Sequence, residues 1–284
     1  MSQQKIYVLG ATGFIGTGTV KFLREKGFEV FTEKIDITDL SALREAFKKT
    51  KPDVVMNFAA VRLIPNVDWC EDHKLETVSV NVAGAINAMT AAIEVGAYPI
   101  MMSSGCVYSG GVDKLFTEED EPNFFGSFYS RMKGVLEKAL KELPVLYLRI
   151  RMPISYSSND KNIINKIISY KKVISIPNSM TLVEDIYPAL LHLINTKPYG
   201  ILNLVNEGYL TNEDILNSYK RVVDPNHQFE LITLGELEKD IVKAKRSNCI
   251  LSMEKAKSLG INMPRIDENR LDEMVGSVFG VTKK

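Results

Sequence analysis

Tyr129 and Lys133 stand four residues apart at the start of a predicted helix over residues 128–143, so both side chains face the same side. A free phenol has a pKa of about 10, which makes it a poor acid at neutral pH. A lysine ammonium one turn away, beside a nicotinamide cation, would lower that pKa by favouring the phenolate. Such a tyrosine can protonate a carbonyl oxygen while hydride reaches the carbon, and the hydroxyl of Ser104 would hold that oxygen.

The stretch "MMSSGCVYSGG" over residues 101–111 places Cys106 two positions after Ser104. A free cysteine thiol has a pKa of about 8.5, and nearby cations bring it into a range that is useful for acid–base catalysis. Because Cys106 leaves the same predicted strand end as Ser104, we expect both to reach the same region of a substrate. The alternative is that Cys106 packs as a small buried apolar side chain, which is the usual fate of a free cysteine.

The string "GATGFIG" follows the first predicted strand and opens a helix, which predicts a dinucleotide-binding turn. Its glycines, Gly10, Gly13 and Gly16, have the spacing G-x-x-G-x-x-G, a variant of the usual fingerprint. Glycines allow a tight turn and close approach of the backbone to a pyrophosphate, and the helix start offers free N–H groups. The expected cofactor contacts in and after this turn are Gly10, Thr12, Gly13, Phe14, Ile15, Gly16 and Ala59.

The segment "FEVFTEKIDITD" should carry the group that recognises the ribose. Glu33 would accept bonds from ribose hydroxyls, whereas Lys34 would pair with a 2′-phosphate, so these residues leave NAD and NADP both open. Both charges are equally compatible with a solvated loop. Asp36 and Ile37 are plausible adenine contacts, and Asp39 is expected to cap the helix that begins near Leu40.

Apolar runs without alternation are separated by amphipathic helical patterns in the first half of the chain, which indicates an α/β fold with a doubly wound parallel sheet. We assign residues 1–152 to a nucleotide-binding domain, with a returning strand near residues 200–206. Residues 153–284 are assigned mainly to a substrate-binding domain that covers the carboxyl edge of the sheet.

The composition excludes several classes of partner. Lys and Arg total 35, as do Asp and Glu, so no nucleic acid or anionic membrane is expected. Three widely spaced cysteines form neither a disulfide framework nor a metal site, so we expect no metal and a reducing compartment. Without an apparent signal peptide or bilayer-spanning apolar run, the chain is predicted to be soluble and cytoplasmic.

Together, the glycine motif, "NVAG" (81–84) with Asn81, Ser104, and the Tyr129/Lys133 pair resemble the extended short-chain dehydrogenase/reductases that act on nucleotide sugars. That resemblance implies a Rossmann-like domain, a smaller C-terminal substrate-binding domain, and Asn81 as a cofactor contact. Within it, "VDWCE" and "RSNCIL" are similar to the dTDP-4-dehydrorhamnose reductase branch. "PNVDWCEDHKLETVSVNVAG", "EEDEPNFFGSFYSRMK", "LRIRMPIS" and "IPNSMT" resemble the reductase part of plant rhamnose synthases over essentially the whole chain.

That part of the plant proteins is a bifunctional 3,5-epimerase/4-reductase of a nucleotide-linked 4-keto-6-deoxyglucose, so the resemblance implies this activity, with NADPH, or alternatively NADH, as cofactor. It also implies that Cys106 functions in epimerisation and that Lys172 in "KVISIPNSMT" is its partner, although Lys171 is adjacent. Substrate contacts are expected from Asn66, Arg151, Asn178 and Arg246, with Arg149 as a further candidate for the pyrophosphate or for a structural ion pair.

Three alternatives remain open from the sequence. The chain could be a 4-reductase alone, a GDP-sugar epimerase-reductase, or a non-catalytic nucleotide-binding regulatory subunit. On the leading interpretation the substrate comes from a separate 4,6-dehydratase. The plant-like strings favour UDP over dTDP as the carrier, and a homodimer is the base expectation.

Overall fold

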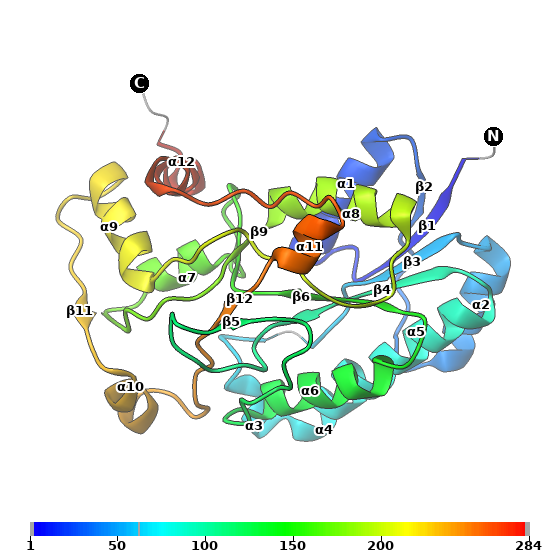
Figure 1. Ribbon diagram of the computed structural model, residues 1–284, viewed down its shortest axis with the longest axis horizontal. Helices are drawn as coiled ribbons and strands as arrows, with labels where there is room; N and C mark the ends of the chain where they lie inside the picture. The colour runs from blue at the N-terminus through cyan, green and yellow to red at the C-terminus, as the bar shows by residue number, and fades with distance from the viewer. Residues whose placement is uncertain (1–2, 62, 282–284) are drawn as a thin grey trace.

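The computed structural model describes residues 3–61 and 63–281, and its centre is a sheet of six parallel strands (Figure 1). The strands lie in the order β10-β6-β4-β3-β1-β2, so the chain steps from β1 outward to β2 and then crosses to β3 on the other side. Such a reversal creates a crevice at the carboxyl edge, between β1 and β3. The bounds are β1 Lys5–Leu9, β2 Glu29–Phe31, β3 Val54–Asn57, β4 Tyr98–Ser104, β6 Leu146–Ile150 and β10 Gly200–Asn203.

Apolar sequence explains why these strands lie at the centre. Every residue of β3, β4 and β6 is buried, as expected for strands that helices cover on both faces. Figure 1 shows α1 and α8 on one side of the sheet and α2, α5 and α6 on the other. The predicted doubly wound α/β fold is therefore confirmed.

The helices pack onto the two faces through separate apolar clusters. Asp39 caps α2 by accepting a hydrogen bond from the backbone N–H of Ala42 at 3.0 Å, as predicted. On one face lie α1 (Phe14–Glu25), α8 (Val183–Thr196) and α11 (Glu254–Ser258). On the other lie α2 (Leu40–Thr50), the π-helix η1 (Ser79–Gly84), α5 (Ala85–Glu94) and α6 (Phe128–Leu140), with α3 (Trp69–Asp72) and α4 (Lys74–Val78) beside α6.

Residues that follow β6 in the chain form a smaller lobe with its own apolar cluster. A capping box formed by Thr211 and Asp214 begins α9. The lobe contains α7 (Ile163–Ile168), α9 (Asn212–Val222), α10 (Leu234–Asp240) and α12 (Glu268–Phe279), and the strand pairs β7 (Pro153–Ile154) with β9 (Thr181–Leu182) and β8 (Lys172–Val173) with β11 (Glu230–Leu231).

The second half of the chain contributes more to the nucleotide-binding body than the returning strand alone. The predicted strand near 200–206 is present as β10, paired in parallel with β6. In addition, α8 packs against α1, and β12 (Ile250–Leu251) pairs with β5 (Leu115–Phe116). Residues 183–205 and 249–263 therefore help to cover one face of the large body, and the division at residue 152 stays a prediction.

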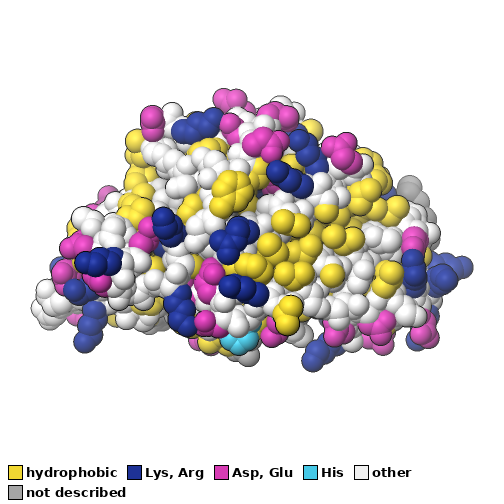
Figure 2. Space-filling view, turned by 90° about the horizontal axis from the view of Figure 1, so that it is seen from below, with side chains coloured by type: hydrophobic (Ala, Val, Ile, Leu, Met, Phe, Trp, Pro, Cys, Tyr) yellow, Lys and Arg dark blue, Asp and Glu magenta, His cyan; other side chains and the backbone are white. Residues whose placement is uncertain are grey.

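Exposed apolar side chains gather on the face that carries α4 and α6 (Figure 2). Leu75 and Val78 of α4 and Val135 of α6 are exposed, Leu75 to 89%. A contiguous apolar area of this kind is uncommon on a monomer and marks a candidate contact surface.

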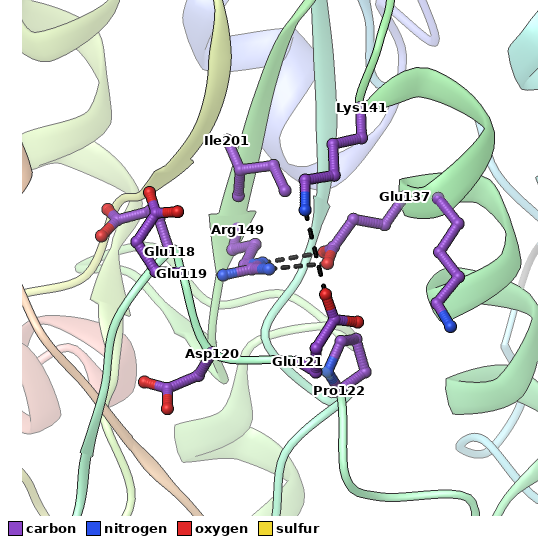
Figure 3. Close-up of a pocket in the computed structure, with 10 residues that line it drawn as sticks. Glu118, Glu119, Asp120, Glu121, Pro122, Glu137, Lys141, Arg149 and Ile201 are labelled. Atoms are coloured by element: carbon purple, nitrogen blue, oxygen red, sulfur yellow. Dashed lines mark hydrogen bonds and ion pairs between the residues drawn. The ribbon is translucent and has the colours of Figure 1, made fainter.

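A buried ion pair joins β6 to α6, and it accounts for Arg149. The Nε and Nη2 atoms of Arg149 donate to both carboxylate oxygens of Glu137, at 2.8 and 2.6 Å, and both side chains are at most 4% exposed. The pair lines a pocket of about 250 Å³ whose other walls include Glu118 to Pro122 (Figure 3). Arg149 is thus the structural ion pair that the sequence left open, and not a phosphate clamp.

Glu137→Gln should lower the free energy of unfolding by about 3 kcal/mol, because it leaves the Arg149 guanidinium buried without a counter-charge. Glu121 forms a comparable but exposed pair with Lys141 at 3.8 Å at the same pocket, so Glu121→Gln should cost less than about 1 kcal/mol. Urea denaturation followed by circular dichroism measures both. Equal losses for the two variants would contradict the stabilising role of the buried pair.

Candidate active site

Parallel strand ends bring the predicted motifs to one edge of the sheet. The glycine turn follows β1, Ala59 follows β3, Ser104 ends β4, and Arg151 follows β6. Within the sheet, Ser104 pairs with Ile150, so the residues directly after β4 and β6 are neighbours although about 45 positions separate them in sequence. This edge is the candidate active site.

The structure leaves no room for a side chain at two of the glycines in this turn. Gly10 has a φ of +73°, and a Cβ placed there would lie 2.6 Å from the backbone nitrogen of Ala59. A Cβ at Gly16 would lie 2.3 Å from the carbonyl oxygen of Gly10. Helix α1 begins at Phe14 with Gly13 as an N-cap that offers no side-chain hydrogen bond, so its first N–H groups stay available, as a pyrophosphate requires. Thr12 is exposed on this turn, and Ile15 packs partly into the core.

The loop after β2 carries Lys34, which is exposed and forms no ion pair with the residues that the structure describes. Asp36 is exposed, and its carboxylate accepts hydrogen bonds from the backbone N–H and hydroxyl of Thr38 in the same loop. These bonds hold the pKa of the Asp36 carboxyl below its usual value. Ile37 is buried in the core, where a Cβ on Gly84 would lie 2.7 Å from it. The Ile37 side chain thus serves packing, and its contact with adenine stays a prediction.

Asn81 lies on the π-helix η1, a type of helix often found at functional sites. Its Oδ1 accepts a hydrogen bond from the Val61 backbone N–H at 3.0 Å, whereas its buried Nδ2 has no partner among the described residues. A buried amide donor without a partner is costly, so it favours an added acceptor at this position. The site fits a bound dinucleotide in this respect as well as in its glycine turn.

The structure brings Ser104, Tyr129 and Lys133 together. Ser127 caps α6, which places Tyr129 in its first turn and Lys133 one turn later, with the Lys133 Nζ 5.6 Å from the centre of the Tyr129 ring. The Ser104 hydroxyl lies close enough to the Tyr129 side chain to lower the pKa of the phenol. This arrangement places two hydroxyl groups where one carbonyl oxygen could accept from both.

Burial controls the charges of this group. It lowers the pKa of Lys133 to about 8, and it raises the pKa of Tyr129. The nearby Cys106 raises the Tyr129 pKa further, and Ser104 lowers it. We expected from the sequence that Lys133 would lower the pKa of Tyr129. In the described structure burial outweighs the cations of the chain, so the phenol keeps its proton and is a donor.

Cys106 is half-buried beside Ser104, whose hydroxyl accepts a hydrogen bond from the Cys106 backbone N–H at 3.1 Å. Arg151 is buried behind it and donates from Nη1 to the Cys106 sulfur at 2.8 Å and from Nη2 to Asn178 Oδ1 at 2.6 Å. Both Nη atoms are thereby engaged inside the protein. Arg151 does not present the open fork that the predicted pyrophosphate clamp requires.

Lys172 lies apart from this group. It is exposed on β8 in the smaller lobe and forms an ion pair with Glu230 of β11 at 3.4 Å. Among the described residues it has no contact with Cys106. Its predicted partnership with Cys106 is therefore not formed in this conformation.

Two other predicted substrate residues meet at the mouth of the site. Arg246 pairs through both Nη atoms with Asp68, at 2.8 and 3.0 Å, and its Nη2 lies 3.5 Å from Asn66 Oδ1. Burial alone would raise the pKa of Asp68, but hydrogen bonds from Arg246 and from the Ala244 backbone N–H hold it below its usual value. This pairing could not be predicted from local sequence patterns, since 178 positions separate Asp68 from Arg246.

Glu71 is a further residue that sequence reasoning missed. Its Oε1 accepts a hydrogen bond at 2.6 Å from the backbone N–H of Phe128, the first residue of α6. Glu71 therefore holds the helix start that carries Tyr129. The only signal for it was its place in the string "VDWCE".

No cluster of three or more His, Cys, Asp or Glu side chains suited to a metal ion occurs in the described residues. Within the same residues, no helix has the length and apolar character needed to cross a membrane.

Comparisons with known proteins agree with this geometry. The chain matches the RmlD substrate binding domain family over residues 4–277. It is 37% identical over 285 residues to the bifunctional dTDP-4-dehydrorhamnose 3,5-epimerase/dTDP-4-dehydrorhamnose reductase of Arabidopsis thaliana, a match that covers 98% of this chain and 93% of that protein.

A second relative from Arabidopsis thaliana is the trifunctional UDP-glucose 4,6-dehydratase/UDP-4-keto-6-deoxy-D-glucose 3,5-epimerase/UDP-4-keto-L-rhamnose-reductase RHM1, 36% identical over 288 residues. The match covers 99% of this chain but 42% of that protein, so the chain spans less than half of the trifunctional relative. Among solved structures, the L780 UDP-rhamnose synthase from Acanthamoeba polyphaga mimivirus superposes with a TM-score of 0.91 and 31% identity, over 98% of this chain and all of that chain.

Two of these relatives are named as enzymes that combine epimerase and reductase activities, and the resemblance inferred from the sequence motifs is confirmed. The chain belongs to the RmlD substrate-binding-domain family.

Proposed function

We propose that the protein is a bifunctional UDP-4-keto-6-deoxy-D-glucose 3,5-epimerase/4-keto-reductase that produces UDP-L-rhamnose with NADPH. The observation that carries this proposal is the shared strand edge, where Ser104, Tyr129 and Lys133 lie with Cys106 beside the glycine turn. The names of the relatives support the two activities, and the UDP-linked names among them favour UDP over dTDP.

In the reduction, the Ser104 and Tyr129 hydroxyls bind the C4 ketone oxygen, and Tyr129 gives it a proton. The Lys133 ammonium stabilises the phenolate that remains. When bound, NADPH supplies the hydride. It would be held by the turn from Gly10 to Gly16, the N-terminus of α1 and the unpartnered Asn81 amide, with Lys34 at its 2′-phosphate.

In the epimerisation, a proton leaves a carbon beside the ketone and returns to the opposite face. The same two hydroxyls stabilise the enolate oxygen that forms. Cys106 serves as the acid–base group on one face. Lys172 is the proposed group on the other face, which requires it to leave Glu230. An exposed pair of this kind is worth at most about 1 kcal/mol, so breaking it costs little.

Asn66, Arg246 and Asn178 are the proposed contacts of the nucleotide-sugar. A 4,6-dehydratase activity outside these 284 residues would supply the 4-keto substrate, as the name of the trifunctional relative suggests. We further propose that the protein works in the cytoplasm as a homodimer through the apolar face of α4 and α6, which sedimentation of Leu75→Glu beside the unaltered protein would test.

Cys106→Ala should lower the incorporation of deuterium at C3 and C5 of the 4-keto substrate in D₂O, without reduced cofactor, by at least about 100-fold. It should still reduce a substrate that has already been epimerised. Nuclear magnetic resonance of the recovered sugar measures the first reaction, and NADPH absorbance the second. Normal exchange in Cys106→Ala would make Cys106 a packing residue.

Tyr129→Phe is the matched variant, because it removes the proton donor and leaves Cys106 in place. It should lower reduction by about 100-fold or more while exchange falls less, since Ser104 still binds the enolate oxygen. A protein that reduces but never exchanges would instead be a 4-reductase alone. One that binds NADPH and does neither would be a regulatory subunit.

Lys34→Met should weaken the binding of NADPH about 10-fold and leave NADH binding unchanged, because it removes one charged contact to the 2′-phosphate. Lys49→Met removes an exposed lysine from α2 and serves as the control. Quenching or enhancement of nicotinamide fluorescence gives the dissociation constants. If Lys34→Met binds NADPH as tightly as Lys49→Met does, Lys34 is only a solvated charge.

A further inference from the structure

Arg151 is a buried cation without a carboxylate partner. It is 3% exposed, and none of the Asp and Glu side chains in the described residues pairs with it. Arg149, two positions earlier on β6, shows the usual solution, since Glu137 neutralises it. A guanidinium cannot lose its proton in a protein, so a buried one requires an anion or a full set of acceptors.

The acceptors around Arg151 are neutral and incomplete. Its Nη2 donates to Asn178 Oδ1 at 2.6 Å and to the carbonyl oxygen of Ser247, whereas its buried Nε has no partner among the described residues. Asn178 is itself fixed, because its amide nitrogen donates to Asn248 Oδ1 at 3.0 Å and its oxygen also accepts from the Cys249 N–H. The guanidinium is therefore held in one orientation, with Nη1 directed at the Cys106 sulfur at 2.8 Å.

Among the described residues, Arg151 interacts with the ionisable groups of Cys106, Cys249 and Tyr129, and Lys133 interacts with Cys106. Burial raises the pKa of Tyr129 and of Cys249, and the Cys249 thiol donates to the Gly105 carbonyl oxygen at 3.4 Å, so both stay neutral. Lys133 is a second cation and adds no negative charge. Cys106 is the remaining group that can provide the anion.

We propose that Arg151 is a positioning residue that holds the Cys106 side chain as a thiolate, aimed at the carbon next to the substrate ketone. Burial alone would lower the pKa of Arg151, but the adjacent Cys106 raises it, which keeps the guanidinium charged. The inference deepens the proposed function and rests on it for the reaction that the thiolate serves.

The thiolate starts the epimerisation without any redox change. Its sulfur takes the proton from the carbon beside the ketone and becomes a thiol. The electron pair of the broken C–H bond moves into a C=C bond, and the carbonyl electron pair moves onto oxygen, where the Ser104 and Tyr129 hydroxyls donate to it. Lys172, the group proposed for the other face, then gives a proton to that carbon as the enolate collapses to the ketone. The Cys106 thiol gives its proton to water and Lys172 takes one from water, so the thiolate is restored against Arg151.

Alkylation by iodoacetamide, followed peptide by peptide with mass spectrometry, tests this proposal without substrate. A free thiol is only a few per cent thiolate at pH 7, so its rate rises about 10-fold per pH unit up to pH 8. Cys106 of the unaltered protein should instead react at a rate that is nearly constant between pH 7 and 9. Cys70 and Cys249 are buried and serve as slow internal controls. A Cys106 rate that rises as for a free thiol overturns the proposal, and this measurement needs no variant.

Arg151→Gln removes the charge, and Arg151→Lys keeps it. At pH 7 the Gln variant should alkylate Cys106 about 10-fold more slowly than the unaltered protein and regain its rate near pH 10, whereas the Lys variant should keep most of the rate. An equal loss for Gln at every pH would show a structural effect only and would overturn the proposal. Arg221→Gln, at an exposed arginine of α9, is the control.

The two proposals fail in different ways. If Arg151 holds the thiolate but the protein shows no deuterium exchange with the 4-keto substrate, the proposed epimerase function is wrong and the inference about Cys106 stands. If exchange occurs while Cys106 alkylates as a free thiol, the function stands and the role of Arg151 is wrong. Arg151→Gln should lose exchange about 10-fold at pH 7.

Discussion

The parallel pairing of β4 with β6 is the constraint on which the site depends. Because Ser104 lies opposite Ile150, the chain leaves both strands at the same edge, and Cys106 meets Arg151 there. The same edge receives the glycine turn after β1, since all six strands run in one direction. The sheet thus fixes the spacing between the cofactor turn, the ketone-binding hydroxyls and the thiol before any side chain in the smaller lobe contributes.

Local sequence patterns were enough to predict part of this arrangement of the site. The ends of β4 and β6, the start of α1 at the glycine turn, and the turn of α6 that carries Tyr129 and Lys133 follow from apolar runs and helical spacing over a few residues. Contacts between residues far apart in the sequence could not be predicted from such local patterns. Arg151 was expected to bind phosphate and instead contacts Cys106, because only the packing of the smaller lobe brings Asn178 to one side of its guanidinium. The ion pair that holds Lys172 at Glu230 depends on strands β8 and β11 in the same way.

Burial gives the site its division of charge. Arg149 lies in β6 and Arg151 follows it two positions later, yet Glu137 neutralises Arg149 while Arg151 donates to neutral oxygen atoms and to the Cys106 sulfur. Around the ketone position, burial keeps Tyr129 protonated and brings the pKa of Lys133 down to about 8. Tyr129 as a proton donor and Cys106 as the proposed proton acceptor can therefore lie in one pocket, which is what epimerisation followed by reduction requires.

The most direct test of the central claim is a complete turnover of UDP-4-keto-6-deoxy-D-glucose with NADPH in D₂O, with the position of deuterium in the rhamnose product read by nuclear magnetic resonance. If Ser104 and Cys106 serve the same ketone, the product is UDP-L-rhamnose with deuterium at both C3 and C5. A reduced product that retains hydrogen at both carbons and the D configuration would contradict the account.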